Sequence, residues 1–110
     1  ENGTKEQKIA DFLTYSSEKL HEKGIVVTAD VFGTIIGNDV DIERVGQDYT
    51  ALAGTVDVLS PMVYPSHYGT GVYGYRVPDA EPYGIVLAAL NDSAGELLAL
   101  EEADRAIVRP

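Results

Sequence analysis

The residues of this chain that could do chemistry lie in, or shortly after, two apolar runs. The first run, residues 25–33, carries a single carboxylate, Asp30, near its end. The second run, residues 56–64, ends at Tyr64, and His67 and Tyr68 follow within four residues. A carboxylate can give up or take a proton, and aromatic rings with polar tips can stack on a ligand and hydrogen-bond to it. The pattern therefore predicts a binding pocket in which Asp30 works beside an aromatic cluster.

Strands must place these groups together. Continuous apolar runs bounded by turn residues are typical of strands buried on both faces of a parallel sheet. We therefore predict strands over residues 25–32, 56–64 and 105–109. The carboxyl ends of parallel strands meet at one edge of a sheet, where α/β proteins keep their sites. Gln47, in the connection between the first two strands, is a further candidate for contact with a ligand in this pocket.

Helical patterns separate the predicted strands. Thr4 and Gln7 have capping-box spacing, and they open a helix whose apolar stripe is expected to bury Ile9, Phe12, Leu13 and Leu20. Residues 33–46 have the composition of a loop. A brief helix over residues 49–53 follows, with Asp48 as its cap.

The last helical region shows two pieces. Asp79 is expected to cap the first piece, with Pro82 in its first turn. Residues 91–95 interrupt the pattern, and a second piece is expected over residues 96–102. The order of helix, strand, helix, strand, helix, strand indicates a parallel α/β sheet in a single domain over residues 1–110. The chain stops within the third strand, which predicts a fragment of a larger barrel or sheet.

Composition narrows the classes of partner. Of the 110 residues, 18 are acidic and 8 basic, which gives a formal charge of −10. Such a chain repels phosphate backbones and anionic lipid heads, so nucleic-acid binding is not expected. No run reaches the roughly 20 apolar residues that a membrane span needs, so membrane insertion is not expected either. The chain has no cysteine, which excludes disulfides and thiolate chemistry.

Metal and cofactor sites are not indicated. His21 lies on the polar face of the first predicted helix and is expected to be solvated. His67 has no neighbouring histidine or cysteine, so it does not make a convincing metal ligand. The glycines near Gly69 lack phosphate-loop spacing and are better explained as loop residues. No cofactor is therefore expected.

Four segments resemble a bacterial glycoside hydrolase domain family of the (β/α)8 barrel type. They are Thr-Ala-Asp-Val-Phe-Gly at 28–33, Gly-Gln-Asp at 46–48, Pro-Met-Val-Tyr-Pro-Ser-His-Tyr-Gly at 61–69 and Pro-Asp-Ala-Glu-Pro-Tyr at 78–83. The resemblance covers nearly all of the chain. It implies a piece of a TIM-type barrel, from about the fifth strand to the start of the seventh. Arg109 and Pro110 look like the opening of a later family motif, and an earlier Asp-rich motif is absent.

The resemblance implies that the parent protein cleaves a polysaccharide outside the cytoplasm or at the cell surface. Glycoside hydrolysis generally needs two carboxyl groups. Asp30 is the candidate acid/base here, because partial desolvation at a buried strand end favours the protonated form that a proton donor needs. Its partner is expected on the missing earlier strand, so the fragment alone is expected to be inactive. The alternative for Asp30 is a structural carboxylate that accepts hydrogen bonds from loop amides.

Tyr64, His67 and Tyr68 are the candidates for sugar contact, and loop packing is the alternative. Met62-Val-Tyr64 resembles a Met-x-Tyr segment of chitinase-type barrels, but Pro65 stands where those enzymes have Asp. A non-catalytic polysaccharide-binding barrel and a structural domain of an envelope protein remain alternatives to the hydrolase. In each case, a three-stranded unit with open edges is expected to associate with a second copy.

Overall fold

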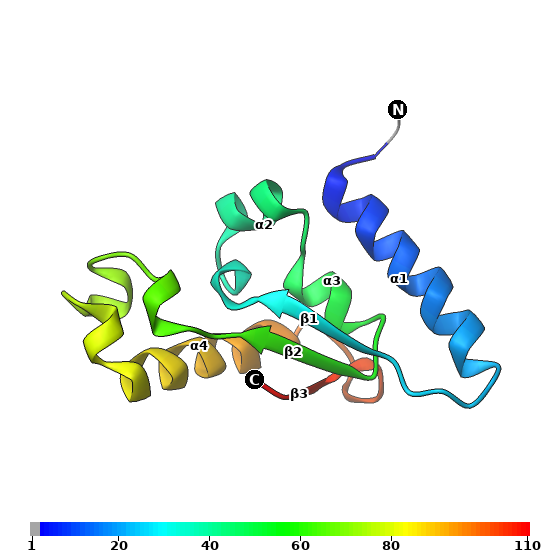
Figure 1. Ribbon diagram of the computed structural model, residues 1–110. Coiled ribbons are helices and arrows are strands. Elements are labelled where there is room, and N and C mark those ends of the chain that lie inside the picture. Colours follow the sequence, from blue (N-terminus) through cyan, green and yellow to red (C-terminus); the bar gives the residue numbers. More distant parts are fainter. Residues whose placement is uncertain (1–2) are drawn as a thin grey trace.

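The computed structural model describes residues 3–110 and contains one three-stranded sheet. Its strands are β1 (Thr28–Phe32), β2 (Val58–Met62) and β3 (Ile107–Val108), in the order β1-β2-β3, with both pairs parallel. Strands and helices alternate along the chain (Figure 1). This confirms the predicted α/β fold, and the arrangement is compatible with part of a (β/α)8 barrel. Each strand is shorter than its predicted span.

The connections differ from the predicted ones in two places. The helices are α1 (Lys5–His21), α2 (Asp39–Val45), α3 (Tyr49–Ala53) and α4 (Pro82–Leu97). α2 falls in the predicted loop. Asn38 is its N-cap, and the Asn38 side chain accepts a hydrogen bond from the Asp41 amide. The helix is short, has no long apolar stripe and begins after a polar cap, so the sequence of this segment resembles that of a loop.

α4 is one continuous helix rather than two pieces. It passes through Gly95 without a break, because its inner face buries side chains from Ile85 to Leu97. Burial of this stripe outweighs the weak helix propensity of residues 91–95. Pro82 stands at the start, as predicted, but the N-cap is Glu81, and Asp79 lies in the preceding 3₁₀ turn.

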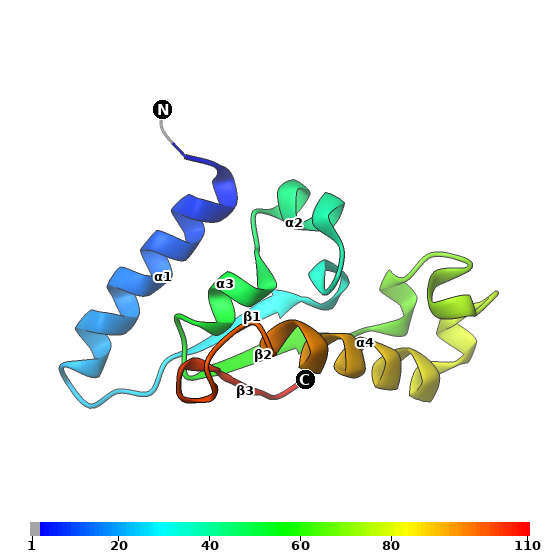
Figure 2. The same cartoon turned by 180° about the vertical axis from the view of Figure 1, so that it is seen from behind.

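The sheet is covered on one face only, which corrects the prediction of strands buried on both faces. In β1, Ala29 and Val31 point to the covered face, whereas Thr28, Asp30 and Phe32 are exposed. α4 lies behind the sheet in Figure 1 and in front of it in Figure 2, so the uncovered face is turned toward the viewer in Figure 1. Alternation of this kind is the signature of a half-buried strand.

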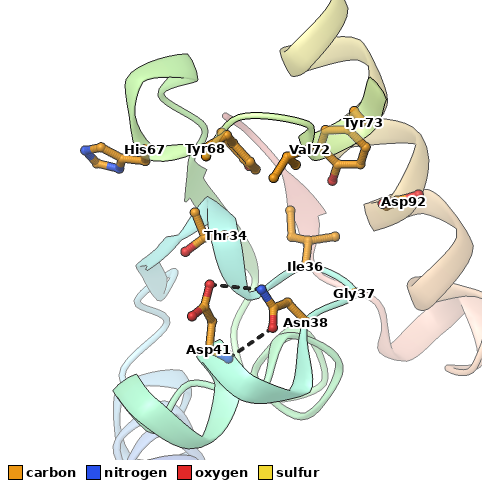
Figure 3. A pocket seen from close by; sticks show the side chains of 11 residues that line it. Thr34, Ile36, Gly37, Asn38, Asp41, His67, Tyr68, Val72, Tyr73 and Asp92 are labelled. Atoms are coloured by element: carbon orange, nitrogen blue, oxygen red, sulfur yellow. Dashed lines mark hydrogen bonds between the residues drawn. The ribbon is translucent and has the colours of Figure 1, made fainter. Parts of the chain in front are cut away.

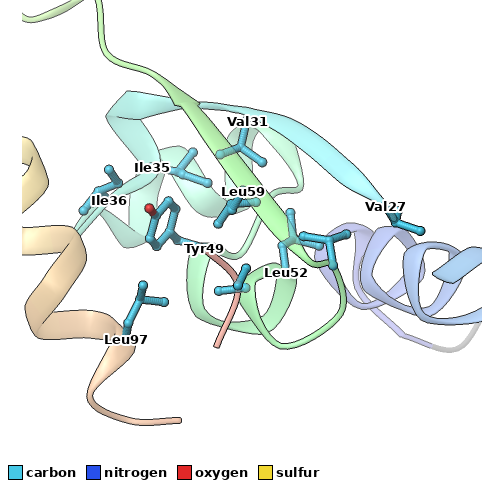
Figure 4. Close-up of a cluster of buried hydrophobic side chains, with 11 residues drawn as sticks. Val27, Val31, Ile35, Ile36, Tyr49, Leu52, Leu59 and Leu97 are labelled. Atoms are coloured by element: carbon cyan, nitrogen blue, oxygen red, sulfur yellow. The ribbon is translucent and has the colours of Figure 1, made fainter. Parts of the chain in front are cut away.

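The core fills the space between the covered face and the helices (Figure 4). Val31 and Leu59 of the sheet pack with Tyr49 and Leu52 of α3 and with Leu97 of α4. The Tyr49 hydroxyl is buried and lies 2.6 Å from the Ser93 hydroxyl of α4. This contact satisfies both hydroxyl groups inside the core, as a buried polar pair requires.

The first helix confirms its predicted cap and differs in its buried stripe. The Gln7 amide donates to the Thr4 hydroxyl, and the Gln7 side chain accepts from the Thr4 amide, which completes the capping box. Phe12, expected in the stripe, is 67% exposed. The stripe that packs on the core is instead Ile9, Ala10, Leu13 and Leu20.

His21 is paired rather than simply solvated. Its Nε2 lies 2.7 Å from Asp57 Oδ2, and the same oxygen accepts the Val27 amide at 2.8 Å. The hydrogen bond from the Val27 amide lowers the pKa of Asp57 below its usual value, and the contact with His21 contributes a smaller shift in the same direction. The contact ties the end of α1 to the segment that enters β2.

None of the helices in residues 3–110 combines the length and apolar character that crossing a bilayer requires.

Gly33 is required by the close approach of β1 and β2. A Cβ at this position would lie 2.7 Å from the Met62 carbonyl oxygen and 3.0 Å from Val63 Cα. Both are backbone atoms of the neighbouring segment and cannot rotate away.

We expect Gly33→Ala to lower the free energy of unfolding by about 1–3 kcal/mol, measured by urea denaturation. Gly69→Ala is the control, because a Cβ there meets nothing within 4 Å. Equal stability of the two variants would contradict this account.

Candidate functional site

A hollow of about 560 Å³ is lined by the carboxyl-terminal half of β2, by Asp30 of β1, by α4 and by the last two residues of the chain. We call it the sheet hollow. It contains a carboxylate, two hydroxyl groups and a guanidinium among apolar neighbours; its lining residues are Asp30, Ser60, Pro61, Met62, Val63, Tyr64, Val86, Arg109 and Pro110. The volume falls within the range of roughly 300–1,000 Å³ that is typical of small-ligand sites.

The register of the strands assembles this hollow. Asp30 pairs with Ser60, and Phe32 pairs with Met62, so these side chains share the uncovered face. The Arg109 amide donates to the Leu59 carbonyl at 3.0 Å, which carries Arg109 alongside β2. Tyr64 follows the end of β2 and is 52% exposed. The predicted proximity of Asp30 and Tyr64 at one parallel edge is therefore present.

The environment of Asp30 differs from the expected one. The side chain is exposed, because β1 is uncovered on the face that carries it. The partial desolvation expected for this carboxylate is therefore not provided by residues 3–110. Within the same residues, Asp30 is the one carboxylate that lines the sheet hollow, and Arg109 brings a positive charge to the same space.

A second hollow, of about 280 Å³, lies between the loops that follow β1 and β2. We call it the interloop hollow. The loop after β1 contributes Thr34, Ile36, Gly37 and Asn38, and α2 contributes Asp41; the loop after β2 contributes His67, Tyr68, Gly69, Val72 and Tyr73; α4 contributes Asp92. Figure 3 shows Tyr68, Val72 and Tyr73 facing Thr34, Ile36 and Asn38 across it.

The predicted aromatic cluster is thus divided between two hollows. Tyr64 lines the sheet hollow, whereas His67 and Tyr68 line the interloop hollow. A 3₁₀ turn over Pro65–His67 separates them and changes the direction of the chain. The Tyr64 and His67 rings still touch in an edge-to-face contact, with centroids 5.1 Å apart. The segment from Tyr64 to Tyr68 is therefore a wall shared by both hollows.

Gln47 lines neither hollow. Its Oε1 accepts the Phe32 amide at 2.9 Å and so holds the end of β1 in place. Asp48, the next residue, caps α3 by accepting the Ala51 amide, as expected. Gln47 positions the strand end that carries Asp30, and its contact with a substrate stays a prediction.

Tyr68 and Tyr73 lie in an environment that disfavours ionisation. Burial raises the pKa of Tyr68 to about 12, and the Asp92 carboxylate adds to the shift. Burial and Asp92 also raise the pKa of Tyr73. The Tyr68 hydroxyl is shielded from solvent and has no hydrogen-bond partner among residues 3–110. Both hydroxyls are therefore neutral groups that can donate hydrogen bonds at physiological pH.

Several lining residues were not identified from the sequence. Ser60 and Arg109 could have been found, because strand alternation places them on the face of Asp30. No local sequence pattern connects the other three lining residues. They are Asp41 of α2, a helix that was not predicted, Tyr73 of a long loop, and Asp92 of α4. Within residues 3–110, no group of three or more His, Asp or Glu side chains is placed to hold a metal ion.

Replacing Asp92 tests the electrostatic environment of the two tyrosines. Removing the carboxylate charge favours the phenolate, so Asp92→Asn is expected to lower the pKa of both Tyr68 and Tyr73. The measurement is a pH titration of tyrosine ¹³Cζ shifts by NMR, with assignments from Tyr68→Phe and Tyr73→Phe. Asp79→Asn, an exposed change outside both hollows, should leave both titrations in place. If the pKa values of Tyr68 and Tyr73 are the same in Asp92→Asn as in the wild type, the Asp92 carboxylate does not act on the two tyrosines as described.

Comparison with known proteins agrees with the fold and with the resemblance noted from the sequence. Curated proteins and solved structures gave no match to the chain. A family model described as "Putative glycosyl hydrolase domain" matches residues 1–110. Because this match spans the whole chain, the protein belongs to that glycosyl hydrolase domain family.

Proposed function

We propose that this domain contributes to hydrolysis of a polysaccharide at the sheet hollow, with Asp30 as its acid/base group. The observation that carries the proposal is the convergence of Asp30, Tyr64 and Arg109 on one hollow at the carboxyl ends of parallel strands. This edge is where barrel enzymes hold their catalytic groups. Membership of the glycosyl hydrolase domain family makes a glycosidic bond the expected target.

Each side chain has a role that suits a sugar. The Tyr64 ring offers a face on which a sugar ring can stack. The Ser60 hydroxyl and the Arg109 guanidinium can hydrogen-bond to sugar hydroxyls, and the Asp30 carboxylate can exchange a proton with the glycosidic oxygen or with water. No step requires a cofactor. A polysaccharide substrate places this activity outside the cytoplasm or at the cell surface.

Asp30 needs a second carboxyl group, which the sheet hollow does not supply from this chain. Hydrolases of this kind flank the bond with two carboxyl groups, about 5–10 Å apart. In the proposal, the partner comes from barrel strands outside these 110 residues, which would cover the open sheet face. Such a cover would also exclude water from Asp30 and favour its protonated form. The 110-residue chain alone is then expected to be inactive.

The second candidate function is polysaccharide binding without cleavage. The presence of one exposed carboxylate in the sheet hollow favours it. In this case, Tyr64 and Arg109 hold a sugar, and Asp30 accepts hydrogen bonds from its hydroxyls. A structural domain of an envelope protein would bind no glycan at all.

The variant Asp30→Asn distinguishes these functions. With the full-length protein, a glycan array identifies the ligand, and release of reducing ends measures its cleavage. If Asp30 is the acid/base group, we expect cleavage to fall by roughly 10²–10⁴-fold while binding is retained. Asp11→Asn, an exposed change on α1, is the control and should cleave normally. Unchanged cleavage in Asp30→Asn would remove Asp30 from the mechanism, and binding without cleavage in the wild type would favour the second candidate.

Self-association of the 110-residue chain is a separate part of the proposal. β1 and β3 each have one unpaired edge in the described sheet, and Ile107 of β3 is 66% exposed. Unpaired edges with apolar side chains favour pairing with another copy. Light scattering should show a mass above that of one chain that rises with concentration. Ile107→Lys should reduce it, whereas Val40→Lys, at an equally exposed position of 65% on α2, should not. A constant single-chain mass would contradict this association.

A further inference from the structure

The interloop hollow has no role in the function proposed above. It is lined by ring faces, apolar side chains and carboxylates, and it is smaller than the sheet hollow. A volume of about 280 Å³ lies just below the usual range of small-ligand sites, so it suits one small ring rather than an extended ligand. The question is which chemistry such a space would select.

Charge excludes one class of ligand. Among residues 3–110, Asp41 and Asp92 line the hollow, and no lysine or arginine does. The Arg44 guanidinium lies outside the lining and approaches Asp41 Oδ1 at 3.8 Å, which is a weak contact because the Arg44 side chain is largely exposed. The carboxylates still dominate the charge of the lining, so they repel phosphates, sulfates and acidic sugars. Neutral hydroxyl groups are attracted instead, because an O–H that donates to a carboxylate forms a charge-assisted hydrogen bond. The lining therefore selects a ligand rich in hydroxyl groups and without negative charge.

The remaining lining residues fit a ring with apolar and polar sides. Tyr68 and Tyr73 lie side by side, with ring centroids 5.8 Å apart, and Ile36 and Val72 add apolar surface (Figure 3). The hydroxyl of Thr34 can donate or accept, and the Tyr68 hydroxyl has no partner in the part of the chain that the structure describes. A sugar ring has C–H groups for the aromatic surface and hydroxyls for the polar groups.

The Asp41 carboxylate and the backbone that carries Asp92 are held in place before any ligand binds. The Asn38 side chain donates to Asp41 Oδ2 at 3.0 Å, and Asn38 also caps α2 through the Asp41 amide. Asp92 is adjacent to Ser93, which is fixed in the core by Tyr49. Polar groups that are already oriented lose less entropy on binding than mobile ones.

We propose that the interloop hollow binds a single neutral sugar unit, apart from the site of bond cleavage. Asp92 and Asp41 accept hydrogen bonds from its hydroxyls, and Tyr68 and Tyr73 contact its ring. The proposal deepens the proposed function, on which it rests for carbohydrate as the class of ligand. Because Tyr64 and His67 share one wall, a glycan that is bound in the sheet hollow can extend past that wall into the interloop hollow.

The test is an NMR titration of the ¹⁵N-labelled chain with single sugars. The neutral probes are glucose, galactose, mannose and N-acetylglucosamine; glucuronic acid is the anionic probe, and glucosamine the cationic one. We expect at least one neutral sugar to cause saturable shifts in the amides of residues 34–41 and 67–73, and we expect none from glucuronic acid. Glucosamine binding without any neutral sugar would overturn the proposal in favour of a cation site. Absence of saturable shifts at these residues for every neutral probe would overturn it as well.

Variants separate the two hollows. Asp92→Asn should weaken the binding of the neutral sugar about ten-fold, as loss of one charge-assisted hydrogen bond predicts. Asp79→Asn, a matched change outside the hollow, should bind as the wild type does, with circular dichroism confirming that each variant is folded. Asp30→Asn should retain these shifts even where it abolishes cleavage, so failure of this proposal can be distinguished from failure of the proposed function. Equal affinity of Asp92→Asn and wild type would overturn the role of this hollow.

Discussion

Parallel pairing of β1 with β2 decides where every polar group of interest lies. In a parallel sheet, both strands reach the same edge, so the loops after them must sit side by side. The register of Asp30 with Ser60 and of Phe32 with Met62 brings a carboxylate, a hydroxyl and the start of the Tyr64 segment to one face. The close approach at Gly33 shows how tightly this pairing is set.

The helices cover one face of that sheet and leave the other open. The covered face is apolar, with Val31 and Leu59 packed on Tyr49 and Leu52. The uncovered face mixes the polar Asp30 and Ser60 with the exposed Phe32 and Ile107. In a barrel, such a face would point inward, where apolar residues fill the interior and polar ones approach the opening. The same mixture underlies two of the proposals made here, sugar binding in the sheet hollow and pairing of the isolated chain with a second copy.

Much of the fold could be predicted from the sequence, because its signals are local. The capping box at Thr4 and Gln7, the cap at Asp48 and the β-branched runs each depend on residues a few positions apart. Two-sided burial of β1 was wrong because the apolar residues Ile25 and Val26 lengthened the run, although both are exposed and precede the strand. The alternation of Thr28, Asp30 and Phe32 was the more informative signal. That Asp30 and Tyr64 line one hollow followed from strand order. Their separation from Tyr68 depends on a single 3₁₀ turn, and the contribution of Asp92 depends on how a distant helix packs.

The buried contact between Tyr49 and Ser93 has a consequence for α4 as a whole. Successive residues of an α-helix are turned by about 100° around its axis. The hydroxyl pair at 2.6 Å inside the apolar core fixes the rotation of α4 about its own axis, because any other rotation would leave both hydroxyl groups without a hydrogen-bond partner. The directions in which Asp92 and Glu96 leave the helix are then fixed. Glu96 accepts a hydrogen bond from the Gly37 amide in the segment that follows β1. The rotation of α4 about its own axis, which is fixed inside the core at Ser93, therefore sets where the carboxylates of Asp92 and Glu96 lie.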